Sequence, residues 1–123
     1  MSDIRKRRTM APDTGSRILR TVPREKAFYF FSSIGNYTGM SAASLKEFME
    51  KINEVNVKSL EFHLYRTDFE KWVSEVLEDA WLAGEIRRLQ KFGLIGEALR
   101  DQLYLTVSRR LKRLTSPPGP IQF

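Results

Sequence analysis

Residues 67–77 read TDFEKWVSEVL and carry the clearest apolar stripe in the chain. Their apolar side chains recur within every three or four positions: Phe69, Trp72, Val73, Val76 and Leu77. This spacing lines one face of an α-helix. Thr67, followed three residues later by Glu70, matches a capping box, in which each side chain bonds the backbone N–H of the other residue. We therefore predict an amphipathic helix that begins at Thr67 and packs on a core.

Two further helical segments are predicted before this stretch. Ser44 and Glu47 form a second capping box at the start of a helix over residues 44–55. The apolar residues of this helix share one face: Leu45, Phe48, Met49 and Ile52. Residues 57–65 alternate like a strand but also fit a helix, and we favour the helix.

Two more helices are predicted after the opening stretch. Asp79 can cap the first of them, which ends at Gly93. The second runs over residues 96–114, and its apolar side chains are spaced by three or four: Leu99, Leu103, Val107, Leu111 and Leu114. The face of this last helix opposite the apolar stripe is basic.

An aromatic run lies ahead of the helices. Residues 27–31 read AFYFF, which is too short for a helix before Gly35, and the aromatic content favours a strand. Residues 37–38 are the candidate return arm of a hairpin. We expect these rings to pack in the core, with Tyr29 as the one ring that faces outward.

These elements predict a mainly α fold. It is a compact bundle of four to five short helices with a short N-terminal aromatic strand or hairpin, flanked by extended tails. We place a basic extended tail at residues 1–25, a single mainly helical globular domain at residues 26–115, and a Pro-rich extended C-terminal tail at residues 116–123.

Positive charge is concentrated at the two ends of the chain. Residues 1–26 hold eight Lys or Arg against three acids, whereas residues 27–86 hold five against ten. Residues 87–123 again hold eight against two, within a chain of net charge +6. A slightly acidic middle between two basic segments indicates binding of a polyanion rather than charge that serves solubility alone.

A series of short motifs between residues 28 and 89 is similar to the DUF5752 family. The matching residues are Phe30-Phe31, Tyr37-Thr38-Gly39, Ser41-Ala42, Ser44-Leu45, Ser59-Leu60-Glu61-Phe62-His63, Asp68-Phe69-Glu70, Trp72 and Leu82-Ala83. Thr67 departs from the pattern, because the family commonly has Gly before the Asp. The resemblance covers about half of the chain. It implies a shared fold and an archaeal or thermophilic setting, and it names no mechanism.

Composition excludes several classes of protein. The chain has no Cys, so it has neither disulfides nor thiolate chemistry, and a single His leaves too few ligands for a typical zinc site. No apolar run is long enough to span a membrane, and none follows the N-terminal basic cluster as in a secretory signal. We expect a cytoplasmic protein without a cofactor, a metal or a small-molecule substrate.

His63 and Trp81 are the two residues that could carry another function. His63, close in sequence to Glu61 and Asp68, could act as a general base, but no nucleophile or phosphate loop accompanies it. We therefore expect a structural histidine and no enzyme activity. Trp81 lies away from the apolar stripe of its helix, which makes it a candidate contact with a partner.

The sequence favours a non-enzymatic RNA-binding protein, and among such proteins a ribosomal or ribosome-associated component. Its globule would contact the ribosome, and its tails would follow ribosomal RNA beside neighbouring ribosomal proteins. The candidate RNA-binding residues are Arg5, Lys6, Arg7, Arg8, Arg17, Arg20, Arg24, Lys26, Arg87, Arg88, Lys91, Arg109, Arg110, Lys112 and Arg113. Two alternatives stay open: a protein-interaction module that uses the acidic face and Trp81, and sequence-independent DNA binding.

Overall fold

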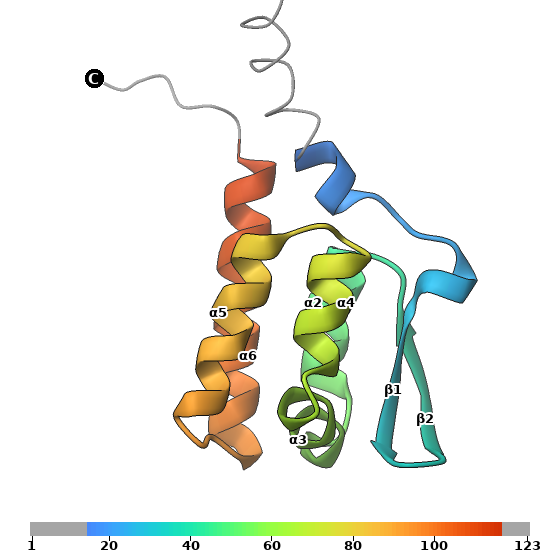
Figure 1. The fold of residues 1–123 in the computed structure, drawn as a ribbon, viewed down its shortest axis with the longest axis vertical. Helices are drawn as coiled ribbons and strands as arrows, with labels where there is room; N and C mark the ends of the chain where they lie inside the picture. The colour runs from blue at the N-terminus through green and yellow to red at the C-terminus, as the bar shows by residue number, and fades with distance from the viewer. Residues whose placement is uncertain (1–14, 117–123) are drawn as a thin grey trace, which may run out of the picture.

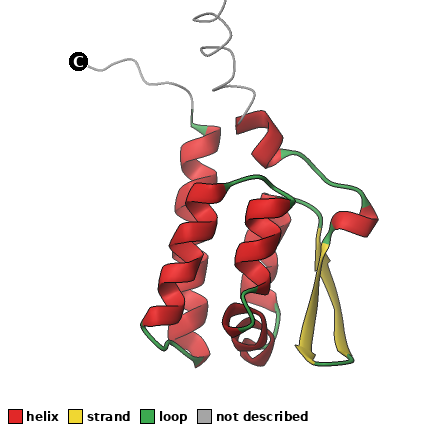
Figure 2. Cartoon of the chain, in the orientation of Figure 1, coloured by secondary structure: helices red, strands yellow, loops and turns green. Residues whose placement is uncertain are grey.

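The computed structural model describes residues 15–116 of the chain. The fold is mainly helical with one two-stranded antiparallel sheet, as predicted (Figure 1 and Figure 2). The elements are a 3-10 turn η1 (Arg24–Lys26), β1 (Phe28–Ser33), β2 (Asn36–Ala42), α2 (Leu45–Glu54), α3 (Val57–Tyr65), α4 (Asp68–Glu75), α5 (Ala80–Lys91) and α6 (Gly96–Thr115). The sequence prediction of a helix over residues 57–65 is confirmed.

The aromatic run forms the first strand of a β-hairpin. β1 pairs with β2 from Phe28 opposite Ala42 to Ser33 opposite Asn36, with register shifts after Phe30 and after Phe31. Gly35 in the turn has φ of +81°, a conformation that glycine adopts without strain. One face of β1 therefore supplies buried aromatic rings to the core.

Two side chains of α3 bond the edge of β1 that β2 leaves unpaired. The Phe31 N–H donates to His63 Nε2 at 2.8 Å, and Ser59 Oγ donates to the Phe31 carbonyl oxygen at 2.8 Å. Ser59 and His63 are four residues apart, so both lie on the same face of α3. Because both are buried, these bonds satisfy polar groups on the helix and on the strand together.

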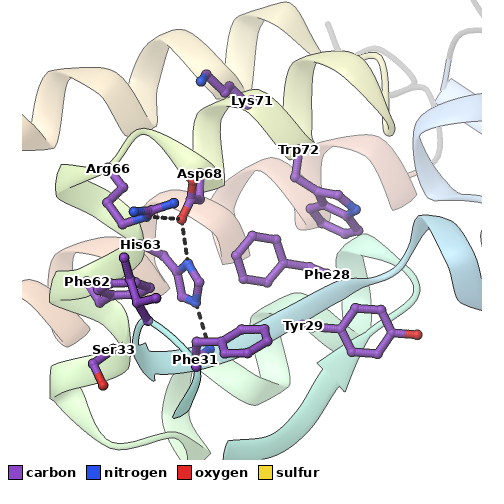
Figure 3. Close-up of a pocket in the computed structure, with 12 residues that line it drawn as sticks. Phe28, Tyr29, Phe31, Ser33, Phe62, His63, Arg66, Asp68, Lys71 and Trp72 are labelled. Atoms are coloured by element: carbon purple, nitrogen blue, oxygen red, sulfur yellow. Dashed lines mark hydrogen bonds and ion pairs between the residues drawn. The ribbon is translucent and has the colours of Figure 1, made fainter. Parts of the chain in front are cut away.

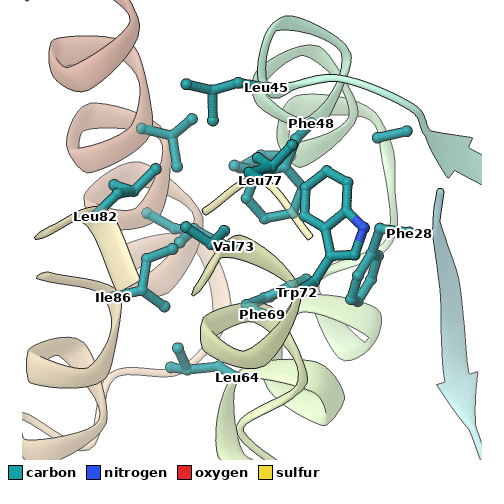
Figure 4. Packing of buried hydrophobic residues seen from close by; sticks show 14 of the residues in the cluster. Phe28, Leu45, Phe48, Leu64, Phe69, Trp72, Val73, Leu77, Leu82 and Ile86 are labelled. Atoms are coloured by element: carbon teal, nitrogen blue, oxygen red, sulfur yellow. The ribbon is translucent and has the colours of Figure 1, made fainter. Parts of the chain in front are cut away.

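The core is centred on a cluster of aromatic rings between the hairpin and the helices (Figure 4). The Phe48 and Phe69 ring centroids are 5.2 Å apart in an edge-to-face arrangement, and those of Phe28 and Trp72 are 5.7 Å apart. The Trp72 indole N–H donates to the Lys26 carbonyl oxygen at 2.7 Å. Burial of one such ring contributes about 1.5–3 kcal/mol, so this cluster is a major source of the stability of the fold.

The three predicted helix caps have different outcomes. Ser44 and Asp79 are N-caps whose side chains accept bonds from the backbone N–H groups of Glu47 and Leu82. The predicted capping box at Thr67 is wrong, since its side chain makes no cap bond. Only two residues separate α3 from α4, and the tight turn holds Thr67 at φ of +68°, in the left-handed region. The family's usual glycine would adopt this conformation without strain.

The packed part of the chain begins before the predicted boundary at residue 26. Residues 15–19 are helical, and Ile18 and Val22 are buried in the core. The Val22 N–H also donates to the Ala43 carbonyl oxygen at 2.7 Å. The sequence predicts an extended tail here because the segment has too few apolar residues to show helical periodicity. In the structure, two buried apolar side chains are enough to anchor the segment to the core.

The predicted tail residues Arg5, Lys6, Arg7 and Arg8 lie outside the described residues, as does most of the Pro-rich C-terminal segment. Among the helices that the structure describes, none has the length and apolar character needed to cross a membrane.

Candidate functional site

Basic side chains from two distant parts of the sequence meet at one end of the molecule. Residues 15–19, the start of α5 and the last turns of α6 lie together there (Figure 1). Arg17 pairs with Glu78 at 2.9 Å, one residue before the Asp79 that pairs with Arg110 of α6. We call this surface the basic end, and it comprises Arg17, Arg20, Arg109, Arg110, Lys112 and Arg113. The described chain both enters and leaves the fold at this end.

A buried ion pair organises the basic end. Asp79 is 2% exposed and caps α5, where its Oδ1 accepts a bond from the Leu82 N–H. Arg110 reaches it from α6 with Nε 2.8 Å from Oδ2 and Nη2 3.1 Å from Oδ1. This bidentate pair joins the start of α5 to α6 and fixes the Arg110 guanidinium. Arg110 was predicted to bind RNA, and two of its five donor hydrogens are committed to this pair instead.

Trp81 belongs to the same surface. Its side chain is 47% exposed, which agrees with the predicted position away from the apolar stripe. The guanidinium carbons of Arg110 and Arg113 lie 5.0 and 5.4 Å from the indole centroid, within cation–π range. These residues border a surface hollow of about 210 Å³, whose lining is Trp81, Glu85, Thr106, Arg109, Arg110 and Arg113.

Three cations of the basic end are not paired with an acid among the described residues. Within residues 15–116, neither Arg109, Lys112 nor Arg113 makes an ion pair or a side-chain hydrogen bond, and all three are exposed. Lys112 and Arg113 lie in the last turn of α6, where a positive charge also interacts favourably with the helix dipole. That contribution needs no partner, so their charged groups stay available to an anion.

The other predicted cations lie elsewhere or are already paired. Arg87 pairs with Glu70 at 3.0 Å and Arg88 with Glu85 at 3.2 Å, and both lie with Lys91 on the later turns of α5. Arg24 and Lys26 lie in η1 beside the hairpin. Arg20 donates to the Val76 carbonyl oxygen, which ties the N-terminal segment to the end of α4. The described residues among the predicted RNA-binding residues therefore do not form one continuous surface.

A second candidate site is an open groove between the hairpin, α3 and α4 (Figure 3). It measures about 490 Å³, and five of its twelve lining residues are aromatic, with His63, Arg66, Asp68 and Lys71 among the polar ones. His63 Nδ1 lies 2.8 Å from Asp68 Oδ2, and its Nε2 accepts the bond from the Phe31 N–H described above. Burial lowers the pKa of His63, while the hydrogen bond to Asp68 raises it in part.

This geometry makes His63 a structural residue. A neutral imidazole has one donor and one acceptor nitrogen, and both are used within the chain. The acceptor that a general base needs is bonded to the backbone of β1, so proton abstraction requires the strand to separate from α3. No cluster of three or more His, Asp or Glu side chains that could hold a metal occurs in the described part of the chain.

Comparison with known proteins identifies the family. The model of a family of unknown function, DUF5752, matches residues 24–118, and the chain therefore belongs to this family. No curated protein and no solved structure matches the chain.

The motif residues that carried the family resemblance have structural roles. Ser59 and His63 bond the edge of β1, Asp68 orients His63, and Trp72 bonds η1. Thr38 Oγ1 donates to the Phe30 carbonyl oxygen and accepts from the Met40 N–H at the first register shift of the hairpin. The motifs therefore account for the fold, and the basic end lies outside them.

Proposed function

For this member of a family without a known function, we propose a non-enzymatic RNA-binding role that is carried by the basic end. The supporting observation is that Arg109, Lys112 and Arg113 are exposed on the last turns of α6 without an acidic partner among the described residues. Phosphate groups are the anions that arginine binds most effectively, through paired N–H donors.

The arginines between the hairpin and the last turns of α6 differ from those of the basic end, and the contrast supports this proposal. Arg66, Arg87, Arg88 and Arg100 each have an acid beside them, as with Arg87 and Glu70 or Arg66 and Asp68. A paired cation gains little from a phosphate because it must first give up its partner, whereas an unpaired one releases counterions from the nucleic acid. Lys46, Lys58 and Lys71 are also exposed without an ion pair among the described residues, but they lie on three different helices, whereas the three unpaired cations of the basic end lie together on α6.

The attached terminal segments add to this surface. The basic cluster at residues 5–8 joins the fold through residue 15, at the same end of the molecule as the last turns of α6. We propose that the cluster and the basic end contact the same RNA. A ribosomal RNA with its large folded surface is the partner that we propose first.

The position of Trp81 favours RNA over the protein-interaction alternative. In that alternative Trp81 would meet a partner together with the acidic face, but the guanidinium groups of Arg110 and Arg113 lie against its ring. A partner at Trp81 thus meets cations first. Phosphate contacts alone do not separate RNA from DNA, so competition between the two nucleic acids must decide.

The proposal is tested by fractionating native lysate on density gradients at low and high salt. We expect the protein to follow ribosomal subunits at low salt and to leave them at high salt. A charge-matched pair of tagged variants identifies the surface: Arg109→Gln with Arg113→Gln should weaken association, and Arg87→Gln with Arg88→Gln should not. Migration as a free protein at low salt, or equal loss in both variants, would contradict the proposal.

A further inference from the structure

We propose that the hollow beside Trp81 holds one unpaired nucleotide, with its base stacked on the indole ring and its phosphates bound by Arg109 and Arg113. The inference rests on the proposed RNA-binding function and deepens it. It implies that the basic end prefers single-stranded to duplex nucleic acid, because a paired base has no free face for stacking.

The first reason is that an aromatic ring stands at the centre of the cationic surface. Trp81 is 47% exposed, whereas the other tryptophan of the chain, Trp72, is 7% exposed and packed in the core. A purely electrostatic surface has no need of an exposed indole. Aromatic rings beside arginines are the usual platform on which single-stranded nucleic acids stack.

The second reason is that the hollow is partly preorganised. Arg110 is held by Asp79 through two hydrogen bonds, and its remaining donor hydrogens make none with the described residues. Trp81 lies against this fixed guanidinium, so the ring is supported from one side. When a ligand stacks on Trp81, the side chains of Trp81 and Arg110 therefore lose little conformational entropy.

The third reason concerns Arg113, which lies 5.4 Å from the Trp81 ring. It is exposed, and within residues 15–116 it has no acidic partner. An exposed cation–π contact is weaker than the stacking of a base on an aromatic ring. A base can thus replace Arg113 on the indole, and the released guanidinium, with Arg109 beside it, is placed to bind the flanking phosphates.

Glu85 sets the orientation of the nucleotide in the hollow. Its carboxylate pairs with Arg88 at 3.2 Å, so the negative charge is held at one side of the lining. A phosphate is repelled there, while the uncharged base is not. The base is therefore expected on the side of Trp81 and Glu85, and the phosphates on the side of Arg109 and Arg113.

Binding of single-stranded RNA of about 12 nucleotides, compared with duplex RNA of the same length, tests the inference. The full chain and its Trp81→Leu variant are titrated at one salt concentration, and Phe92→Leu, which alters another exposed aromatic residue at the far end of α5, is the control. We expect Trp81→Leu to weaken single-strand binding by about tenfold and duplex binding hardly at all. The control should bind like the unmodified chain.

Intrinsic fluorescence gives an independent readout. Single-stranded RNA should quench the emission of the unmodified chain, and this quenching should disappear in Trp81→Leu, whose remaining tryptophan is buried. Trp81→Phe keeps an aromatic ring and should retain most of the affinity, which separates stacking from any effect of the substitution on folding. Single-stranded DNA in a parallel titration shows whether the site requires the ribose 2′-hydroxyl.

The outcomes separate the inference from the function on which it rests. Equal binding of single strands and duplex, with no quenching and no effect of Trp81→Leu, would overturn the inference and leave a phosphate-binding surface. Absence of salt-sensitive binding to any RNA would overturn the proposed function itself. Preference for the single strand, lost in Trp81→Leu and kept in Trp81→Phe, supports the inference.

Discussion

The groove beside His63 and the basic end beside Trp81 are built alike but leave different groups free. In both, a carboxylate orients a nitrogen-bearing side chain: Asp68 holds His63, and Asp79 holds Arg110. His63 uses both ring nitrogens within the chain, whereas Arg110, within residues 15–116, keeps donors free beside two arginines that have no acidic partner there. The comparison teaches that, of these two clusters, the one at the basic end retains hydrogen-bonding capacity for a ligand among the described residues.

The largest effect on stability is expected from breaking the ion pair between Asp79 and Arg110 at the basic end. Asp79→Ala removes the α5 cap and leaves Arg110 without its buried partner, so we expect the free energy of unfolding to fall by about 3–5 kcal/mol. Denaturant unfolding measures this loss. Asp79→Asn, which keeps a capping oxygen, should lose clearly less, and equal losses in the two variants would show that the cap does not contribute.

Removal of the histidine in the groove should have the next largest effect. His63→Ala leaves the Phe31 N–H without its acceptor in a buried position, which costs about 1–3 kcal/mol. Hydrogen exchange at the Phe31 amide should accelerate in the same variant. Lys71→Ala, at the rim of the same groove, is the control and should stay within about 0.5 kcal/mol of the unmodified chain.

Stability should also depend on pH through His63. Its folded-state pKa lies below the ordinary value of 6.5 because burial disfavours the charged ring. The unfolded chain then binds the proton more tightly, so protonation favours unfolding. The contribution is complete above pH 6.5 and is lost as the pH falls from there through the folded-state pKa.

Thermal unfolding of the unmodified chain and of His63→Gln between pH 5 and about 7.5 measures this term. The melting temperature of the unmodified chain should fall more steeply on acidification than that of the variant. Parallel curves for the two proteins would mean that His63 does not titrate differently in the folded and unfolded chains.

The smallest effect on stability is expected from substitutions of the cations that we propose bind RNA. Arg109→Gln, with no partner among the described residues, should change the free energy of unfolding by less than about 0.5 kcal/mol. The same substitution should weaken RNA binding. A loss of stability comparable to that of His63→Ala would show that Arg109 is a structural residue.

Local signals in the sequence predicted much of the fold. The caps at Ser44 and Asp79 depend on backbone groups within three residues, and both are confirmed. The cap at Thr67 failed because its conformation is set by the short connection between two helices, which the helix pattern alone does not show. Ile18 and Val22 were missed because their burial depends on helices and strands that come later in the chain.

The candidate site was predictable only in part. Helical spacing placed Arg109, Lys112 and Arg113 on an outer face and Trp81 away from the core. The pair between Asp79 and Arg110 joins residues 31 positions apart, and no local pattern reports it. This pair holds Arg110 beside Trp81, at the edge of the hollow.

The central claim is tested most directly by the salt dependence of RNA binding. The affinity of the full chain for single-stranded RNA is measured over a range of salt for the unmodified protein and two charge-matched triple variants. One variant carries Arg109→Gln, Lys112→Gln and Arg113→Gln, and the other carries Arg87→Gln, Arg88→Gln and Lys91→Gln.

If the basic end binds phosphates, the first variant should lose about 2 from the slope of log affinity against log salt, since each single-strand phosphate contact contributes about 0.7. The second variant should keep nearly the full slope. An unchanged slope in the first variant, or equal losses in both, would contradict the assignment of RNA binding to the basic end.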